Sequence, residues 1–255
     1  MADWAIVTGA SGGLGKAYAR YLAACGLNLA LVARNTAAMD ELAEELKFKW
    51  GVETKVFTCD LADAKQRAKL LKSLAELPVD TLVNNAGYGL LGRFAELDIK
   101  AQANMIELNC VALTELTHAF LPKMLAAKQG SIINVASTAS FQPLPGMSVY
   151  AATKSYVLNF TTGLAAEIEG TGVRCIAICP GPTDTAFFEV AGDDSVMPSR
   201  RSPEQVVQTT FDGLAANRSY IVDGLANRTL AKTSSLAPQS LNLKVTKKLF
   251  EKVIK

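Results

Sequence analysis

The chain has one histidine, almost no net charge and no long apolar run, and each absence excludes a class of function. Lysine and arginine total 26 against 24 acidic residues, a balance that gives no nucleic-acid signature. No apolar run approaches the ~20 residues of a membrane span, and the N-terminus lacks a charged-then-apolar signal. His118 lies in a mostly apolar helical stretch, which favours a structural role over a ligand or base.

Cysteine use excludes a disulfide framework and a metal site. The five cysteines fall inside apolar strand or helix patterns, with no C-x-x-C and no clustering with histidine. They are interpreted as reduced, buried residues in a reducing compartment, which predicts a cytoplasmic protein. With 255 residues, 49% of them hydrophobic, the chain can bury one sizeable core in a single domain.

Strand-like and helical patterns alternate along the chain without repeats or an internal linker. Apolar strand-like runs fall near 4–8, 28–33, 54–58, 80–84, 131–136, 173–179 and 219–223. Helical patterns lie at 14–25, 36–50, 63–76, 98–127, 149–169 and 203–216. Strand, helix, strand throughout predicts an α/β fold, a doubly wound Rossmann-type parallel sheet of about seven strands with helices on both faces.

A glycine-rich turn, Thr8–Gly15, joins the first strand to the first helix. Gly9, Gly13 and Gly15 allow a tight turn and a close backbone approach to a pyrophosphate at the helix N-terminus. A plain turn also explains a lone glycine cluster. The strand before it and the helix after it favour a dinucleotide site.

Tyr150 and Lys154 form a Y-x-x-x-K pair, with Ser137 thirteen residues upstream. On a helix, this spacing places the phenol and the ammonium on one face. A free tyrosine has a pKa near ~10, and a nearby cation favours the phenolate and makes proton exchange feasible. Ser137 is positioned to hold a carbonyl or alcohol oxygen. Standing alone, the pair is equally typical of a solvated helix face.

With these motifs the chain resembles the short-chain dehydrogenase/reductase family over roughly residues 3 to 225. The glycine turn matches, as does Asn84-Asn85-Ala86-Gly87 after its apolar run. Asn109, Ser137, Tyr150 and Lys154 have the order and spacing of the family's catalytic tetrad. Pro180-Gly181-Pro182-Thr183 follows a strand, as the family's nicotinamide-side turn does.

The resemblance implies the strand order 3-2-1-4-5-6-7 and a set of site residues. Tyr150 would be the acid/base, Lys154 would lower its pKa and hold the ribose, and Ser137 would position the oxygen. Asn109 would bend its helix and hold a water that links Lys154 to solvent; alternatively it bonds a neighbouring backbone. The expected cofactor contacts are Gly9, Ser11, Gly13, Leu14, Gly15, Arg34, Asp60, Leu61, Asn85, Ala86, Gly87, Tyr150, Lys154, Pro180, Gly181, Thr183 and Thr185.

Arg34, at the end of the second strand, indicates the cofactor. An NAD-binding turn carries an acidic residue there, whereas this chain has no carboxylate until Asp40. An arginine pairs with a 2′-phosphate, so NADP(H) is the predicted cofactor, with NAD(H) as the second choice. A solvated strand-end arginine is the plainer alternative. Asp60 either holds the adenine ring or caps the next helix.

The stretch 181–202 breaks the alternation, and a loop of this length is usually functional; in the family it is the substrate lid. The candidate pocket residues are Tyr88, Leu90, Leu91, Phe94, Phe141, Leu144, Met147, Phe187 and Phe188. Their apolar character predicts a hydrophobic ketone, aldehyde or alcohol as substrate. Two alternatives are a non-catalytic protein that senses dinucleotides and a dehydratase or epimerase on the same fold.

Residues 226–255 extend beyond the domain predicted for 1–225. Leu241, Val245, Leu249 and Val253 recur every four residues, with Phe250 and Ile254 beside them, and 241–255 carries five lysines against Glu251. This pattern predicts a basic amphipathic helix over about 240–254, separable from catalysis. Its apolar stripe is expected to pack on the domain or on a second subunit of a dimer or tetramer; an anionic membrane surface is the less favoured alternative.

Overall fold

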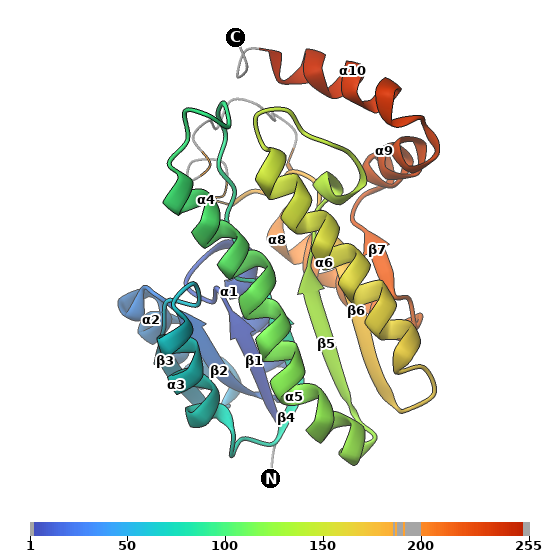
Figure 1. Cartoon of the computed structure of the whole chain (residues 1–255). Coiled ribbons are helices and arrows are strands. Elements are labelled where there is room, and N and C mark those ends of the chain that lie inside the picture. Colours follow the sequence, from blue (N-terminus) through green and yellow to red (C-terminus); the bar gives the residue numbers. More distant parts are fainter. Residues whose placement is uncertain (1–2, 186, 188–190, 192–199, 252–255) are drawn as a thin grey trace.

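A seven-stranded parallel sheet organises the structure, a computed structural model that describes residues 3–185, 187, 191 and 200–251. The strand order β3-β2-β1-β4-β5-β6-β7 is the predicted one (Figure 1). The strands are β1 (Trp4–Thr8), β2 (Asn28–Ala33), β3 (Thr54–Thr58), β4 (Val79–Asn84), β5 (Gly130–Val135), β6 (Val173–Cys179) and β7 (Tyr220–Val222). Because the order reverses between β1 and β4, a crevice opens at their carboxyl ends.

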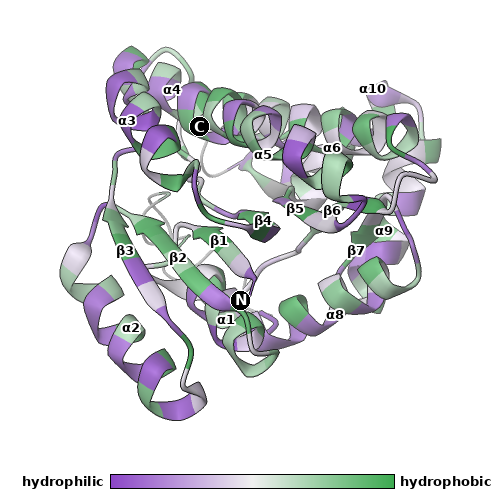
Figure 2. Ribbon diagram, turned by 90° about the horizontal axis from the view of Figure 1, so that it is seen from below, coloured by the Kyte–Doolittle hydropathy of each residue, from purple (hydrophilic) through white to green (hydrophobic). Residues whose placement is uncertain are grey.

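Helices cover both faces of this sheet, as the alternating pattern predicts. Figure 2 shows α3, α4, α5 and α6 on one face, and α1, α2 and α8 on the other. The helices are α1 (Gly13–Ala24), α2 (Thr36–Trp50), α3 (Ala64–Leu74), α4 (Ile99–Ile106), α5 (Leu113–Ala127), α6 (Ser148–Glu167), α8 (Pro203–Ala215), α9 (Leu225–Leu236) and α10 (Gln239–Leu249). A π-helical segment, η1 (Glu107–Ala112), interrupts the predicted helix 98–127 between α4 and α5.

Alternating residues of each central strand supply two separate cores. Ala5 and Val7 of β1 belong to the core under α1, α2 and α8. Trp4 and Ile6 of the same strand belong to the core on the opposite face. This arrangement explains why the strands are continuous apolar runs: a parallel sheet is buried on both faces.

The C-terminal extension forms two helices, α9 and α10. They lie beyond the carboxyl ends of the strands (Figure 1). The expected helix thus begins one residue early, and residues 252–255 lie outside the described part. Leu241 and Val245 are each 52% exposed, so these two residues of the predicted stripe do not pack on the domain. Thr246 and Phe250 are buried instead. Among the described residues, no helix combines the length and apolarity needed to cross a membrane.

Candidate active site

A cavity of about 890 Å³ lies where the strands end, and most of the predicted site residues line it. They are Gly9, Ser11, Gly13, Leu14, Arg34, Asp60, Leu61, Asn85, Ala86, Gly87, Ser137, Tyr150, Lys154, Pro180, Gly181, Thr183 and Thr185. Gly15 and Asn109 are the exceptions. The carboxyl edge of the sheet therefore brings together motifs that are up to 176 positions apart in the chain, from Gly9 to Thr185.

The glycine turn is held by close backbone packing. Gly9 and Gly13 have φ angles of 67° and 46°, which favour glycine. A Cβ on Gly15 would lie 2.1 Å from the Gly9 carbonyl oxygen. Gly15 was expected to contact the cofactor, but it packs the start of α1 against the turn. The α1 N-cap, Gly12, provides no side-chain hydrogen bond, so the first amides of α1 lack a side-chain cap.

Arg34 and Asp60 mark the far end of the cavity from Tyr150. Arg34 is exposed and follows β2 directly, beside Asn35, whose side chain caps α2. Asp60 accepts a hydrogen bond from the Ala62 amide through its Oδ1 at 3.0 Å. Asp63, which accepts from two amides, is the N-cap of α3. The alternative interpretation of Asp60 as the helix cap is therefore wrong.

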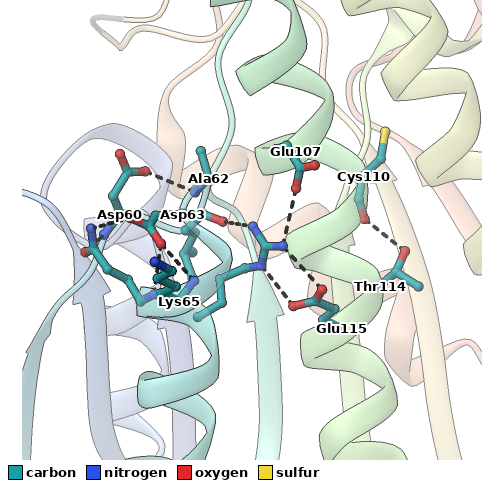
Figure 3. Close-up of polar contacts among 11 residues, drawn as sticks. Asp60, Ala62, Asp63, Lys65, Glu107, Cys110, Thr114 and Glu115 are labelled. Carbon is teal, nitrogen blue, oxygen red and sulfur yellow. Dashed lines mark hydrogen bonds and ion pairs between the residues drawn. The ribbon is translucent and has the colours of Figure 1, made fainter.

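A buried arginine, Arg67, connects the Leu61 turn to η1 and α5; Figure 3 shows its two carboxylate partners, Glu107 and Glu115. The Arg67 side chain is 3% exposed and donates to the Leu61 carbonyl at 2.8 Å. It also donates to Glu115 at 2.9 Å and to Glu107 at 3.3 Å. The hydrogen bond from Arg67 lowers the pKa of Glu115. One guanidinium thus holds both the Leu61 turn and the helix that carries Asn109.

Asn109 lies in η1, behind the cavity wall. Its Oδ1 accepts from the Tyr88 amide at 3.2 Å, and its Nδ2 donates to the Tyr88 carbonyl and the Thr153 hydroxyl, each at 3.0 Å. A Cβ on Gly87 would lie 2.9 Å from Asn109 Oδ1 and 3.5 Å from Lys154 Nζ. The expected helix distortion occurs at Asn109. Its amide bonds a neighbouring backbone, which was the plainer alternative.

Ser137, Tyr150 and Lys154 meet at the ends of β5 and α6. Tyr150 and Lys154 are one turn apart on α6, and both are buried. The Ser137 side chain lies close enough to the Tyr150 hydroxyl to lower its pKa. Lys154 donates to the Val135 carbonyl at 2.7 Å, and its Nζ lies 5.8 Å from the centre of the Tyr150 ring. The three side chains form one wall of the cavity.

Burial dominates the protonation of this wall. It raises the pKa of Tyr150 to about 12, and the Ser137 side chain opposes the shift. Burial also lowers the pKa of Lys154 to about 8, while Cys110 and Cys179 act in the opposite direction. Lys154 was expected to lower the pKa of Tyr150. In this structure burial raises the pKa of Tyr150 instead, and the Lys154 ammonium is directed to the Val135 carbonyl.

Apolar residues line the cavity next to Tyr150. Of the predicted pocket residues, those in the lining are Tyr88, Leu91, Leu144, Met147 and Phe187. Phe94 is 62% exposed, Leu90 packs outside the lining, and Phe141 contacts Tyr220 instead. Phe188 and most of the predicted lid, 186, 188–190 and 192–199, lie outside the described residues.

Lining residues from the C-terminal quarter of the chain were not predicted. They are Arg201, Gly224, Leu225, Ala226, Asn227, Leu230, Thr246 and Phe250. Arg201 pairs with the buried carboxylate of Asp223 at 2.6 Å, and Thr209 donates to the same group at 2.7 Å. No sequence motif marked these residues, because α9 and α10 reach the cavity only by folding back.

The chain belongs to the short-chain dehydrogenase family, whose model matches residues 3–195. Sulfoacetaldehyde reductase 2 of Chromohalobacter salexigens is 39% identical over 73% of this chain and 75% of its own. Very-long-chain 3-oxoacyl-CoA reductase-B of Danio rerio is 32% identical over 82% of this chain and 67% of its own length. A short-chain dehydrogenase from Sphingobium yanoikuyae, solved with NADPH, has a TM-score of 0.85 at 32% identity, covering 94% of both chains.

Stability should depend on pH through Lys154. The pKa of Lys154 is lowered on folding, so the unfolded chain binds this proton more tightly. Lys154 therefore contributes a rise in the free energy of unfolding with pH, of roughly 2 kcal/mol between about pH 7.5 and about pH 9.5; buried thiols such as Cys59, whose pKa burial raises, contribute in the opposite direction, so the contribution is measured as the difference between wild type and variant. In urea denaturation, Lys154→Met should remove this rise, whereas Lys244→Met, on the exposed side of α10, should retain it. Identical pH dependence in wild type and Lys154→Met would contradict the prediction.

Proposed function

We propose that this oxidoreductase of the short-chain dehydrogenase family uses NADP(H) to interconvert a hydrophobic ketone or aldehyde and the matching alcohol. The observation that carries the proposal is the single cavity shared by the glycine turn, Arg34 and the Ser137–Tyr150–Lys154 wall. The two curated relatives are, by their names, reductases of carbonyl compounds. The apolar lining around Met147 and Phe187 favours a hydrophobic substrate.

The residues present fit a nicotinamide dinucleotide. The turn leaves no space for side chains at Gly9 and Gly13, where a Cβ would lie 2.7 Å from Asn85 Nδ2 and 2.9 Å from the Thr185 methyl. The amides at the start of α1 have no side-chain cap, so they suit a pyrophosphate. Arg34 suits a 2′-phosphate, and Thr183 and Thr185, the predicted partners of the carboxamide, line the same cavity.

Tyr150 is the proposed acid/base. When bound, the nicotinamide supplies or accepts the hydride. Tyr150 gives its proton to the carbonyl oxygen in reduction and takes it back in oxidation. With a pKa of about 12, the phenol is protonated at neutral pH and ready for reduction. Ser137, whose side chain acts on that hydroxyl, holds the substrate oxygen and stabilises its developing charge.

Lys154 and Asn109 support the proton donor. Lys154 is protonated below a pKa of about 8, so its cation lies close to the phenol at neutral pH. Besides Val135, its ammonium has donors left for the ribose hydroxyls. Asn109 fixes the Tyr88 backbone beside Gly87, which keeps the space next to Lys154 open. The expected water relay remains part of the proposal.

The second candidate function is a non-catalytic protein that binds the dinucleotide and reports its redox state. The cavity and Arg34 serve that role equally well, so turnover separates the two. We further propose a homo-oligomer in the cytoplasm, because Leu236 of α9 is 77% exposed and a second subunit would cover it. Four of the five free cysteines are buried, as suits a reducing compartment.

Tyr150→Phe should abolish turnover and leave cofactor binding intact, because it removes the proton donor and keeps the ring. We expect kcat with NADPH and a ketone to fall roughly 10²–10⁴-fold, while the Kd for NADPH changes less than about twofold. Tyr156→Phe, an exposed tyrosine on the same helix, is the matched control. Activity of Tyr150→Phe within tenfold of wild type would refute the acid/base assignment.

Arg34 should make NADPH the preferred cofactor. Arg34→Asp places a negative charge where the 2′-phosphate would lie and adds an acceptor for a ribose hydroxyl, so the preference should reverse to NADH. Hydrogen bonds to charged groups are worth about 1.5–3 kcal/mol, which predicts roughly a 10- to 100-fold loss of NADPH affinity. Lys49→Asp, in the last turn of α2, changes the net charge by the same amount. It should leave the Kd values for NADPH and NADH unaltered. Equal wild-type Kd values for NADPH and NADH would contradict the proposal.

A further inference from the structure

The cavity extends beyond the family's shared motifs to the C-terminal helices. Four side chains from this region, Leu225, Leu230, Thr246 and Phe250, line it together with Tyr150 and Met147. Thr246 and Phe250 lie four positions apart, so they occupy one face of α10. They are 1% and 4% exposed, whereas Leu241 and Val245 point outward. The tail therefore presents its buried face to the site.

Phe250 belongs to the same apolar cluster as the proposed acid/base. That cluster contains Tyr150, Met147 and Leu144, with Phe187 packed against it, and the rings of Tyr150 and Phe187 lie 5.3 Å apart. Phe250 therefore reaches the region in which a substrate of Tyr150 must place its carbon skeleton. An aromatic ring at this point fills volume and defines how far the pocket extends.

Hydrogen bonds hold α10 in this position. Asn242 donates to the Ser234 carbonyl at 2.7 Å, which ties α10 to α9. The Ser234 hydroxyl donates to Gln142 Oε1 at 2.8 Å. Gln142 lines the cavity and directly follows the short helix η2 (Thr138–Phe141), whose N-cap is Ser137. Two steps thus connect α10 to the segment that holds the substrate oxygen.

The wall formed by α10 is suited to apolar groups. The Thr246 hydroxyl donates within its own helix, to the Asn242 carbonyl at 2.9 Å, so this donor is already used. The charged lining residues Arg34, Asp60 and Lys154 all come from the predicted cofactor contacts. Arg201 also lines the cavity, but it is paired with Asp223. A neutral carbon chain matches this end of the cavity.

We propose that α10 is the distal wall of the substrate pocket, and that Phe250, with Thr246 beside it, limits the length of the apolar chain carried by the carbonyl substrate. This inference rests on the proposed oxidoreductase function and adds the residue that selects among substrates. Phe250 acts by contact with the part of the substrate remote from the reacting carbon, and Thr246 supports it from the preceding turn.

The test uses the holoenzyme and a series of linear 2-alkanones of increasing length. Phe250→Ala enlarges the pocket and should shift the preferred length upward, whereas Phe250→Trp should shift it downward. Because about one methylene in an apolar pocket changes specificity 10-fold or more, we expect the ratio of kcat/KM between long and short ketones to change at least tenfold. The change should lie in KM, with kcat within about threefold for the best substrate.

Control variants distinguish a role of Phe250 in the pocket wall from a role in folding alone. Leu241→Ala, exposed on the same helix, should leave the length profile unchanged. The Kd for NADPH should stay within about twofold of wild type in every variant, which also shows that each variant is folded. If Phe250→Ala fails this check, the milder Phe250→Leu takes its place. A ratio within about twofold of wild type in both folded Phe250 variants would overturn the proposal.

A binding measurement keeps this inference distinct from the proposed function. Nile red, a neutral apolar dye, is titrated into the NADPH complex and followed by fluorescence. Phe250→Trp should weaken dye binding at least about fivefold relative to Leu241→Ala. If wild type reduces no carbonyl compound but this difference appears, the proposed reaction fails and the pocket wall stands. If Phe250→Trp and Leu241→Ala bind the dye equally well, the proposed role of Phe250 in the pocket wall is refuted, even where Tyr150 proves catalytic.

Discussion

The contact between the ends of β1 and β4 sets the geometry on which the site depends. The Thr8 hydroxyl accepts from the amides of Asn85 and Ala86, at 2.9 and 3.0 Å, and donates to the Val83 carbonyl at 3.2 Å. The Asn85 side chain donates a hydrogen bond to the Thr8 carbonyl at 2.8 Å. These bonds join two turns at the strand pair where the sheet reverses its order. The crevice that opens there places the glycine turn and the Asn-Ala-Gly turn side by side.

Burial sets the pKa values of Tyr150 and Lys154, which form one wall of the cavity. Tyr150 and Lys154 share one face of α6, and both are removed from water. Desolvation favours the neutral form of each, so their pKa values move in opposite directions, toward about 12 and about 8. A charge close to this pair acts in a medium of low dielectric and has a larger effect than it would in water. The helical spacing brings the two groups together, and the sheet beneath them supplies the desolvation.

The cofactor half of the site could be predicted because each of its motifs follows a strand of its own. Gly9, Arg34, Asp60, Asn85 and Pro180 all come directly after an apolar run, and the carboxyl ends of parallel strands meet at one edge. A local pattern thus fixed a position in space. Packing decides the positions of the two predicted residues that do not line the cavity. A Cβ on Gly15 would meet the Gly9 carbonyl, and the amide of Asn109 bonds the Tyr88 backbone.

The substrate half was less predictable, because it is built from segments with no fixed relation to a strand. Periodicity indicated that residues from 241 onward are helical, with Leu241, Val245, Leu249 and Val253 on an apolar stripe and Phe250 and Ile254 beside it. The structure exposes Leu241 and Val245 and buries Phe250 together with Thr246; Asn242 bonds α10 to Ser234 of α9, and Ser234 bonds Gln142. A helix with large apolar residues on several sides has no single face that hydrophobicity selects. Its polar contacts decide which side chains reach the cavity, and those contacts become apparent only when the chain is folded.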